Sequence, residues 1–336
     1  MQSPANTPQR VALIGDAFVD VQINGVSSIP AWGGCSECSG VQILPGGSCC
    51  NVGRQLASIS GGELEALFFS TVGDDDMGRF YTRALAGEGL LAELEHTLCV
   101  RAGVPQSTCV ILAGQSDRAM IDAPGSNSCV SIESTGVGEA AEQQGGAQPW
   151  VLLHIGGYFN CVGLHTEQTL ELVRAARARG TLVSVDTQFD TTGAWTGVDG
   201  HLARLLPLCD VFLPNEVEAA AISGAVTAPD ALDALTATFP ALLVVLKHGA
   251  RGLLAGRGAE RWSAPALQAR FVDATGAGDA ADAGFLLQYL RDRADVPAAL
   301  RSANAAGACA VAAAGGCVRP VAREEYLALV SAATEK

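Results

Sequence analysis

Residues 273–279 read Asp-Ala-Thr-Gly-Ala-Gly-Asp, and they run directly into the stretch 280–290. This second stretch carries an apolar stripe with helical spacing, formed by Ala281, Phe285, Leu286 and Tyr289. The pattern predicts a glycine-rich turn that feeds the N-terminus of a helix. Such a turn exposes several backbone N–H groups beside the positive end of the helix dipole. We therefore expect Gly276, Ala277 and Gly278 to hold a phosphate or a developing oxyanion.

Asp279 is the unusual residue at this helix start. A carboxylate beside an anion site is electrostatically costly unless it has a function, such as accepting the proton of a hydroxyl that attacks a phosphoryl group. Two other interpretations remain open on this segment alone. Residues 276–281 also match the GxGxxA dinucleotide fingerprint, although a Rossmann unit continues into further strands and the sequence here continues as helix. The segment also fits an ordinary helix capped by an aspartate after a turn.

The composition describes an α/β protein of enzyme size. Of the 336 residues, 49% are hydrophobic and only 5% aromatic, so the core must consist mainly of Ala, Val and Leu. The excess of 35 acidic over 21 basic residues gives a formal net charge of −14, which argues against a nucleic-acid partner. Short apolar or β-branched runs recur between helical stretches and predict a mostly parallel sheet. These runs span 11–14, 67–72, 151–155, 182–186, 211–213 and 242–246.

Two stretches break this alternation, at 18–44 and 98–132. They alternate apolar with polar residues and carry Gly and Pro, as half-exposed antiparallel strands do, so we expect a small β-sheet appendage. The segment 133–148 is rich in Gly, Glu and Gln and is predicted to be a mobile loop. We expect residues 1–9 to be a disordered N-terminus and residues 10–336 to form one domain.

Several chemistries are excluded because their patterns are missing. The only lysines are Lys247 and Lys336, and neither follows a glycine, so a Walker A phosphate loop is absent. No GxSxG or HExxH sequence supports a serine hydrolase or a zinc protease. No apolar run suits a membrane span and the N-terminus lacks a signal-peptide pattern, so we expect no membrane partner and a cytoplasmic location. Among 11 cysteines, Cys35 and Cys38 form the only CxxC pair, which we interpret as free thiols.

Four further motifs accompany residues 273–279 in order along the chain. The first is Gly46-Gly47-Ser-Cys-Cys-Asn51, which leads into a helix, and the second is Val-Gly-Asp-Asp-Asp-Met-Gly at 72–78, which follows the next strand. The third is Pro214-Asn215-Glu216-Val217-Glu218, with an NxxE pattern, and the fourth is Lys247-His-Gly249-Ala-Arg-Gly252. Together they resemble the ribokinase-like (PfkB) carbohydrate kinase family over about residues 11–320. The resemblance implies an α/β fold, namely a ribokinase-like three-layer sandwich with a mostly parallel central sheet and a small β-sheet lid.

The resemblance also implies a role for each matching residue. Asp279 would be the catalytic base, with an anion hole formed by Gly276, Ala277 and Gly278. The sugar would be bound by Asp20, Gly46, Gly47 and Asn51, and the nucleotide by Asn215, Lys247, Gly249, Gly252 and Asn304. Glu218, with Asn215, would organise water around Mg²⁺ and the phosphates. ATP and Mg²⁺ are the cofactors that this family implies.

Three points stay open. Asp16 and Asp20 fall on the same face of a strand, so Asp16 is the alternative sugar ligand if the register shifts. The run Asp-Thr-Gln-Phe-Asp at 186–190 lacks the Arg of family members that act on keto-acids, which disfavours a substrate with a carboxylate. Activation by a monovalent cation such as K⁺ is undecided, because Arg319 falls near the position where ribokinase offers a Ser ligand.

We interpret the chain as an ATP-dependent kinase that phosphorylates a hydroxyl of a small sugar or sugar-like alcohol. A nucleoside (adenosine-like) kinase is the alternative enzyme. A catalytically silent sugar-binding or nucleotide-binding sensor on the same fold is an alternative of another class, although the intact Asp279 argues against it. Exposed lid strands could pair across a homodimer.

Overall fold

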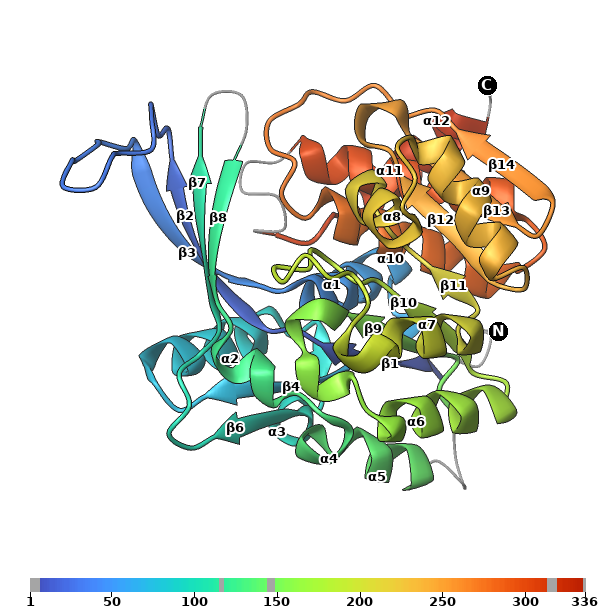
Figure 1. The fold of residues 1–336 in the computed structure, drawn as a ribbon, viewed down its shortest axis with the longest axis horizontal. Helices are drawn as coiled ribbons and strands as arrows, with labels where there is room; N and C mark the ends of the chain where they lie inside the picture. The colour runs from blue at the N-terminus through green and yellow to red at the C-terminus, as the bar shows by residue number, and fades with distance from the viewer. Residues whose placement is uncertain (1–6, 115–117, 144–148, 313–318, 335–336) are drawn as a thin grey trace, which may run out of the picture.

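The computed structural model describes residues 7–114, 118–143, 149–312 and 319–334. Its main element is a ten-stranded sheet with the order β14-β13-β12-β11-β10-β9-β1-β4-β5, and β6 pairs with β4 outside this path (Figure 1). The parallel strands are β1 (Gln9–Gly15), β4 (Leu64–Gly73), β5 (Leu91–Ala92), β6 (Leu98–Arg101), β9 (Leu152–Gly156), β10 (Leu182–Val185), β11 (Val211–Phe212) and β12 (Leu243–Lys247). The antiparallel strands are β13 (Leu253–Arg257) and β14 (Glu260–Ala264). The apolar runs of the sequence therefore predict six of these parallel strands correctly and miss β5 and β6.

The central strand β1 explains why helices cover both faces of the sheet. Side chains alternate between the faces of a strand, and residues 11–14 of β1 are all buried. One apolar cluster contains Val11 and Leu13, and the other contains Ala12 and Ile14. Helices with side chains in or against the first cluster are α1 (Ser48–Ser60), α2 (Asp76–Glu88), α3 (Leu94–Thr97), α10 (Ala277–Arg291), α11 (Val296–Val311) and α12 (Arg323–Thr334). Those of the second are α4 (Ile132–Thr135), α5 (Val137–Gln143), α6 (Glu167–Ala178), α7 (His201–Leu205), α8 (Glu216–Ser223) and α9 (Ala228–Thr238).

Short 3₁₀ helices occupy several of the connections. They are η1 (Gly125–Cys129), η3 (Tyr158–Asn160), η4 (Val162–Leu164), η5 (Val198–Gly200), η6 (Leu206–Leu208) and η7 (Gly249–Arg251). With the helices on both faces of the sheet, the architecture is the predicted three-layer α/β sandwich.

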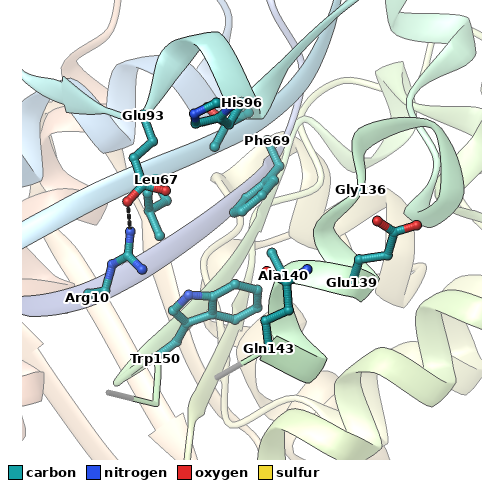
Figure 2. A pocket seen from close by; sticks show the side chains of 11 residues that line it. Arg10, Leu67, Phe69, Glu93, His96, Gly136, Glu139, Ala140, Gln143 and Trp150 are labelled. Atoms are coloured by element: carbon teal, nitrogen blue, oxygen red, sulfur yellow. Dashed lines mark hydrogen bonds and ion pairs between the residues drawn. The ribbon is translucent and has the colours of Figure 1, made fainter. Parts of the chain in front are cut away.

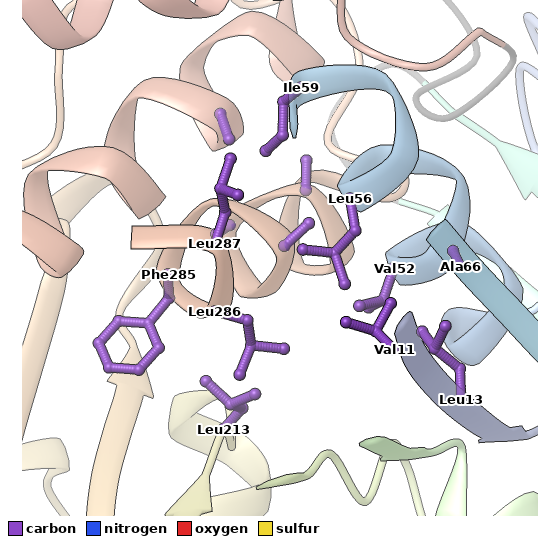
Figure 3. Packing of buried hydrophobic residues seen from close by; sticks show 14 of the residues in the cluster. Val11, Leu13, Val52, Leu56, Ile59, Ala66, Leu213, Phe285, Leu286 and Leu287 are labelled. Carbon is purple, nitrogen blue, oxygen red and sulfur yellow. The ribbon is translucent and has the colours of Figure 1, made fainter. Parts of the chain in front are cut away.

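Helix α10 is buried on most of its circumference. Figure 3 shows Phe285 and Leu286 of this helix in the same cluster as Leu56 of α1. The apolar stripe that the sequence predicts is buried, and α11 packs so closely that a Cβ added at Gly284 would lie 2.7 Å from the carbonyl oxygen of Ser302. This packing holds the N-terminus of α10 in place at the carboxyl edge of the sheet.

A second sheet projects from the body of the molecule (Figure 1). Its strands are β3 (Gly40–Gly46), β2 (Phe18–Asn24), β7 (Thr108–Ala113) and β8 (Arg118–Ala123), in that order. Its strands come from the two stretches that the sequence assigns to a lid, but β3 continues two residues beyond the first stretch and the second stretch starts too early in the prediction. Residues 98–101 form β6, which pairs with β4 of the large sheet, because their alternation also suits an edge strand. Cys35 and Cys38 lie between β2 and β3 as free, exposed thiols.

Two further boundaries differ from the prediction. Residues 132–143 form α4 and α5 instead of a mobile loop, because Ser131 and Ser134 make a reciprocal capping box and Gly136 turns left-handed between the helices. The rest of the predicted loop, 144–148, lies outside the described residues. The predicted disordered N-terminus ends too late, because Gln9 already belongs to β1 and its N–H donates to the carbonyl of Glu63. Residues 1–6 are also outside the described part.

Candidate active site

The site begins at the N-terminus of α10. Gly276 is the residue before the helix and has a φ of 71°, a left-handed conformation that glycine adopts at little cost. No side chain caps this helix end. The helix dipole makes this end of α10 positive, and one of the N–H groups there, that of Ala277, donates to the carbonyl of Ala274 at 3.2 Å. The structure places Gly276, Ala277 and Gly278 at this helix start, and their role as an anion hole stays a prediction.

Asp279 lies in this first turn and is only 7% exposed. Asn51 of α1 donates from Nδ2 to Asp279 Oδ2 at 2.8 Å, although 228 positions separate the two residues. Burial raises the pKa of Asp279 to about 6, and the negative charge of Asp186 adds to the rise, while hydrogen bonds from Asn51 and Ser48 and the charge of Lys247 oppose it. A carboxyl group with this pKa is mostly ionised at neutral pH and can also be reprotonated there.

Asn51 is itself held in one orientation. Arg54, one turn further along α1, donates from Nη1 to Asn51 Oδ1 at 3.2 Å. The Arg54 guanidinium is buried and forms two hydrogen bonds with Glu88 of α2, at 2.8 and 2.5 Å. This pairing leaves the Asn51 amide nitrogen directed at Asp279.

Asp20 lies on β2, the lid strand nearest in sequence to β1. Gly46 of β3 makes room for it, because a Cβ at position 46 would lie 2.3 Å from Asp20 Oδ2. Burial raises the pKa of Asp20 to about 8, and the charges of Asp16 and Asp279 contribute. The fold thus brings Asp20, Gly46 and Asn51 to the same edge of the sheet as Asp279.

Asp16, the alternative to Asp20, is engaged by the protein. Its Oδ1 accepts the N–H of Cys49 at the start of α1, and its Oδ2 accepts Nδ2 of Asn160, both at 2.9 Å. Gly47 and Gly157 pack against it, since a Cβ at Gly157 would lie 2.1 Å from the Asp16 carboxyl carbon and one at Gly47 would lie 2.5 Å from the Asp16 carbonyl oxygen. Asp16 therefore anchors the N-terminus of α1.

Asn215 and Glu218 form a capping box at the start of α8. The side chain of Asn215 accepts the N–H groups of Val217 and Glu218, and Glu218 Oε2 accepts the N–H of Asn215. Burial raises the pKa of Glu218 to about 8, and the charge of Asp186 contributes. The NxxE pattern therefore has a structural role at the end of a helix that faces the site.

The predicted nucleotide residues fall into two groups. Asn304 of α11 donates to the carbonyls of Ala264 and Pro265 at 3.2 and 2.9 Å, and a Cβ at Gly252 would lie 2.1 Å from the same Ala264 carbonyl. These residues hold the chain that leaves β14, and Gly249, with a φ of 55°, begins the turn before β13. Lys247 is their neighbour on β12, but its side chain has other partners, because its Nζ pairs with Asp186 at 2.9 Å and with Asp282 at 2.7 Å.

The sequence analysis missed Asp186 and Asp282, and it also missed Gln188 and Ser48 beside them. Gln188 Nε2 donates to Ser48 Oγ at 3.0 Å and to Asp186 Oδ2 at 3.1 Å. One signal was available, because Asp282 follows Asp279 by three residues in a predicted helix and so shares its face. The partners of Asp186 come from distant parts of the chain and leave no local pattern.

A cavity of about 650 Å³ lies elsewhere, beside the amino-terminal end of β1. Figure 2 shows Trp150 and Phe69 in its wall and an ion pair between Arg10 and Glu93 at its side. None of the predicted site residues lines it. Within the described ranges, no three His, Cys, Asp or Glu side chains are grouped to hold a metal ion, and no helix is long and apolar enough to cross a membrane.

Comparison with known proteins shows the family to which this chain belongs. The family model for pfkB family carbohydrate kinases matches residues 8–321. An ATP-dependent ribose-1-phosphate kinase of Halopiger xanaduensis is 28% identical over 299 residues, which cover 89% of this chain and 90% of that protein. A fructokinase of Vibrio alginolyticus is 28% identical over 313 residues, covering 90% and 92%. An aminoimidazole riboside kinase of Salmonella typhimurium is 28% identical over 322 residues, covering 91% and 90%.

Solved structures share the fold. A ribokinase of Arabidopsis thaliana, in complex with ribose and ATP, matches with a TM-score of 0.76 at 22% identity and covers 97% of this chain and 99% of its own. A fructokinase of Vibrio cholerae O395, in a form with fructose, ADP and calcium ion bound, matches with a TM-score of 0.74 at 23% identity, covering 97% and 100%. At these identities the likeness shows the ribokinase fold.

Proposed function

We propose a mechanism on the premise that this chain belongs to the pfkB family of carbohydrate kinases and is an ATP-dependent sugar kinase. In this mechanism the γ-phosphate of ATP passes to a hydroxyl of a small sugar or sugar-like alcohol. The observation that carries the proposal is the 2.8 Å hydrogen bond between Asn51 and Asp279 at the glycine-rich start of α10. This bond brings three features together: the Asp279 carboxylate with a pKa of about 6, the Asn51 amide where the sugar would bind, and the helix start that would hold the phosphate.

Asp279 acts as the general base. One oxygen of its carboxylate takes the proton of the attacking hydroxyl as the hydroxyl oxygen approaches the γ-phosphate, which makes that oxygen a better nucleophile. The glycine-rich turn at Gly276, Ala277 and Gly278, at the positive end of the α10 dipole, stabilises the negative charge that develops on the transferred group. After transfer, Asp279 releases the proton to water, which a pKa of about 6 permits at neutral pH.

Asp20 and Asn51 hold the acceptor. With a pKa of about 8, Asp20 is mostly the neutral acid at neutral pH, and its carboxyl group can donate to one hydroxyl and accept from its neighbour, while the Asn51 amide also supplies both a donor and an acceptor. Asp190 stands where an Arg would bind a substrate carboxylate, and its oxygens accept the N–H groups of Thr192 and Trp195 within its own loop. We therefore infer a neutral acceptor, with a nucleoside as the alternative that the riboside kinase relative suggests.

Mg²⁺ would be held mainly by the phosphates of ATP. Glu218 and Asn215 are both engaged in the capping box, so they would orient water molecules around the bound ion through their oxygens and would not be its direct ligands. The bound ion would neutralise phosphate charge. Activation by K⁺ is tested by comparing the rate of phosphorylation in K⁺ with the rate in Na⁺.

We also propose a homodimer through the lid. Val21 of β2 pairs with Ile43 and Val110, and Val110 pairs with Ile121, which makes an apolar row across all four strands on the face opposite Asp20. Ile43 is 43% and Ile121 is 63% exposed. A second copy would cover this row, and Ile121→Lys should then convert a dimer into a monomer in light scattering. A wild-type monomer at assay concentration contradicts the dimer.

A coupled assay of ADP release tests the function. Pentoses, hexoses, polyols and nucleosides are screened with ATP and Mg²⁺, and the same panel is run with Asp279→Asn. Turnover of one acceptor class that the variant loses supports the mechanism. Binding of sugar or nucleotide without turnover of any acceptor would identify a silent sensor instead. We place the protein in the cytoplasm, where ATP and reduced thiols are available.

A further inference from the structure

Lys247 lies against the anion hole and away from any open edge of the fold. Its Nζ pairs with Asp186 Oδ2 and Asp282 Oδ2, and its side chain is 11% exposed. A Cβ built on Gly278 would lie 3.9 Å from Nζ. The ammonium group is therefore buried between the ends of β10 and β12 and the first turns of α10.

Hydrogen bonds connect Lys247, Asp186 and Asp282 with the residues proposed to bind the sugar. Asp186 Oδ2 accepts from Gln188 Nε2, which also donates to Ser48 Oγ. Ser48 begins α1, and Asn51 of the same helix donates to Asp279. Asp279 and Asp282 are three residues apart on α10, so the contacts close on themselves. The positioning ring, as we call it, consists of Lys247, Asp186, Gln188, Ser48, Asn51, Asp279 and Asp282.

We propose that Lys247 is a positioning residue for phosphoryl transfer: through the positioning ring it holds the first turns of α10 against α1, and so holds Asp279 in place for the acceptor hydroxyl. The inference rests on the proposed function of Asp279. It replaces the nucleotide-binding role that the sequence analysis assigned to Lys247, because both visible partners of the ammonium group are protein carboxyl groups.

The charges of the cluster support this assignment. Burial would lower the pKa of Lys247, but the charges of Asp186 and Asp282 raise it above its usual range, so the residue stays an ammonium ion. Burial raises the pKa of Asp282 well above its usual range. At Asp186 burial is also the largest influence, but the charge of Lys247 and the hydrogen bonds from Asp282, Lys247 and the Gln188 N–H together hold the pKa of that carboxyl below its usual range. The cluster is thus one cation, one anion and one neutral acid. Removing the cation alone would leave Asp186 as an unpaired buried charge.

Four variants separate the possible roles of Lys247. Lys247→Met removes the cation, and Lys247→Met/Asp186→Asn removes the ion pair without leaving a net charge. Gln188→Leu opens the ring at a half-buried, uncharged residue, and it keeps the test valid should the Lys247 variants fail to fold. Tyr326→Phe is the matched control, because it removes the buried 2.7 Å hydrogen bond to Ser302 on the far side of α10.

Kinetics give the first readout. We expect the charge-matched double variant and Gln188→Leu to keep the KM for ATP within about twofold of wild type while kcat falls by roughly ten- to a hundredfold, the loss that a small misplacement of a catalytic group causes. Tyr326→Phe should leave both constants unchanged. A raised KM for ATP with wild-type kcat would show that Lys247 binds the nucleotide and would overturn the inference, as would unchanged constants in all ring variants.

Hydrogen exchange gives a readout that needs no turnover. Peptides covering residues 277–283 should exchange roughly tenfold faster in the double variant than in wild type or in Tyr326→Phe, because α10 loses its tie to β10 and β12. Equal exchange in all proteins overturns the positioning role. A wild-type protein that exchanges slowly and phosphorylates no acceptor would contradict the proposed function and leave the structural part of the ring standing, so the two failures differ.

Discussion

The hydrogen bond from Asn51 to Asp279 should determine the pH at which the enzyme loses activity in acid. Asn51→Leu keeps a similar side-chain volume and removes the 2.8 Å bond to Asp279 Oδ2. A hydrogen bond to a buried charged group contributes about 1.5–3 kcal/mol, and it stabilises the ionised form. One pKa unit corresponds to about 1.36 kcal/mol, so the pKa of Asp279 should rise by about one to two units from its value of about 6.

The sign of the effect follows from which form is active. The base must be ionised, so activity is lost as the pH falls through the pKa of Asp279. A higher pKa moves this loss to higher pH. The acid limb of kcat/KM for the acceptor should therefore shift from about pH 6 in the wild type to about pH 7–8 in Asn51→Leu, measured between about pH 5 and pH 9.

Asn160→Leu is the matched control for this experiment. It removes a chemically equivalent amide bond, 2.9 Å long, from Asp16 instead of Asp279. Its acid limb should stay at the wild-type position even if the rate falls. An Asn51→Leu enzyme whose acid limb does not move, or a control whose limb moves equally, would refute the assignment of Asp279 as the titrating base.

Three more predictions test the site. Asp279→Asn should lower kcat by roughly 10²–10⁴ and leave the dissociation constant of ATP unchanged in calorimetry, because only the base is lost; near-normal kcat would rule out general-base catalysis by this residue. The pKa of Asp20 is raised to about 8, so its burial destabilises the fold increasingly as the pH rises from about 4 to about 8. Asp20→Asn should therefore lose acceptor binding but raise the melting temperature relative to wild type at about pH 8.5, with little effect on it at about pH 4. A variant that is destabilised at both pH values would contradict this. Gly46→Ala would place a Cβ 2.3 Å from Asp20 Oδ2, so the KM for the acceptor should rise while the KM for ATP stays constant, and equal effects on both constants would indicate general misfolding.

Local chemistry explains the parts of the fold that could be predicted from the sequence. A parallel strand buried on both faces must be apolar along its length, so β1, β4 and β12 are visible as short runs of apolar residues. The glycine-rich turn before α10 is visible for a similar reason, since Gly276 needs a positive φ that few other residues adopt. The prediction failed where one local sequence pattern is compatible with two kinds of secondary structure. Residues 98–101 alternate like a lid strand but pair with β4, and residues 132–143 have a loop-like composition but are held as helices by a capping box.

The sequence motifs indicated which residues belong to the site, but they did not indicate which side chains those residues contact. The pattern at 273–279 indicates a base beside an anion site, and the structure places Asp279 in the first turn of α10 as expected. The bond from Asn51 to Asp279 and the ion pairs from Lys247 to Asp186 and Asp282 join residues that lie 228, 61 and 35 positions apart. No short-range periodicity records such pairs.

The amino-acid sequence thus specified six strands of the large sheet and the glycine-rich turn that begins α10, because each depends on neighbours a few residues away. The tertiary structure decided that Asp16 anchors α1 whereas Asp20 lies beside Gly46, and that Lys247 is enclosed by carboxyl groups. The physical reason is that burial and charge set the behaviour of an ionisable side chain. Both are properties of the surroundings that only the folded chain assembles.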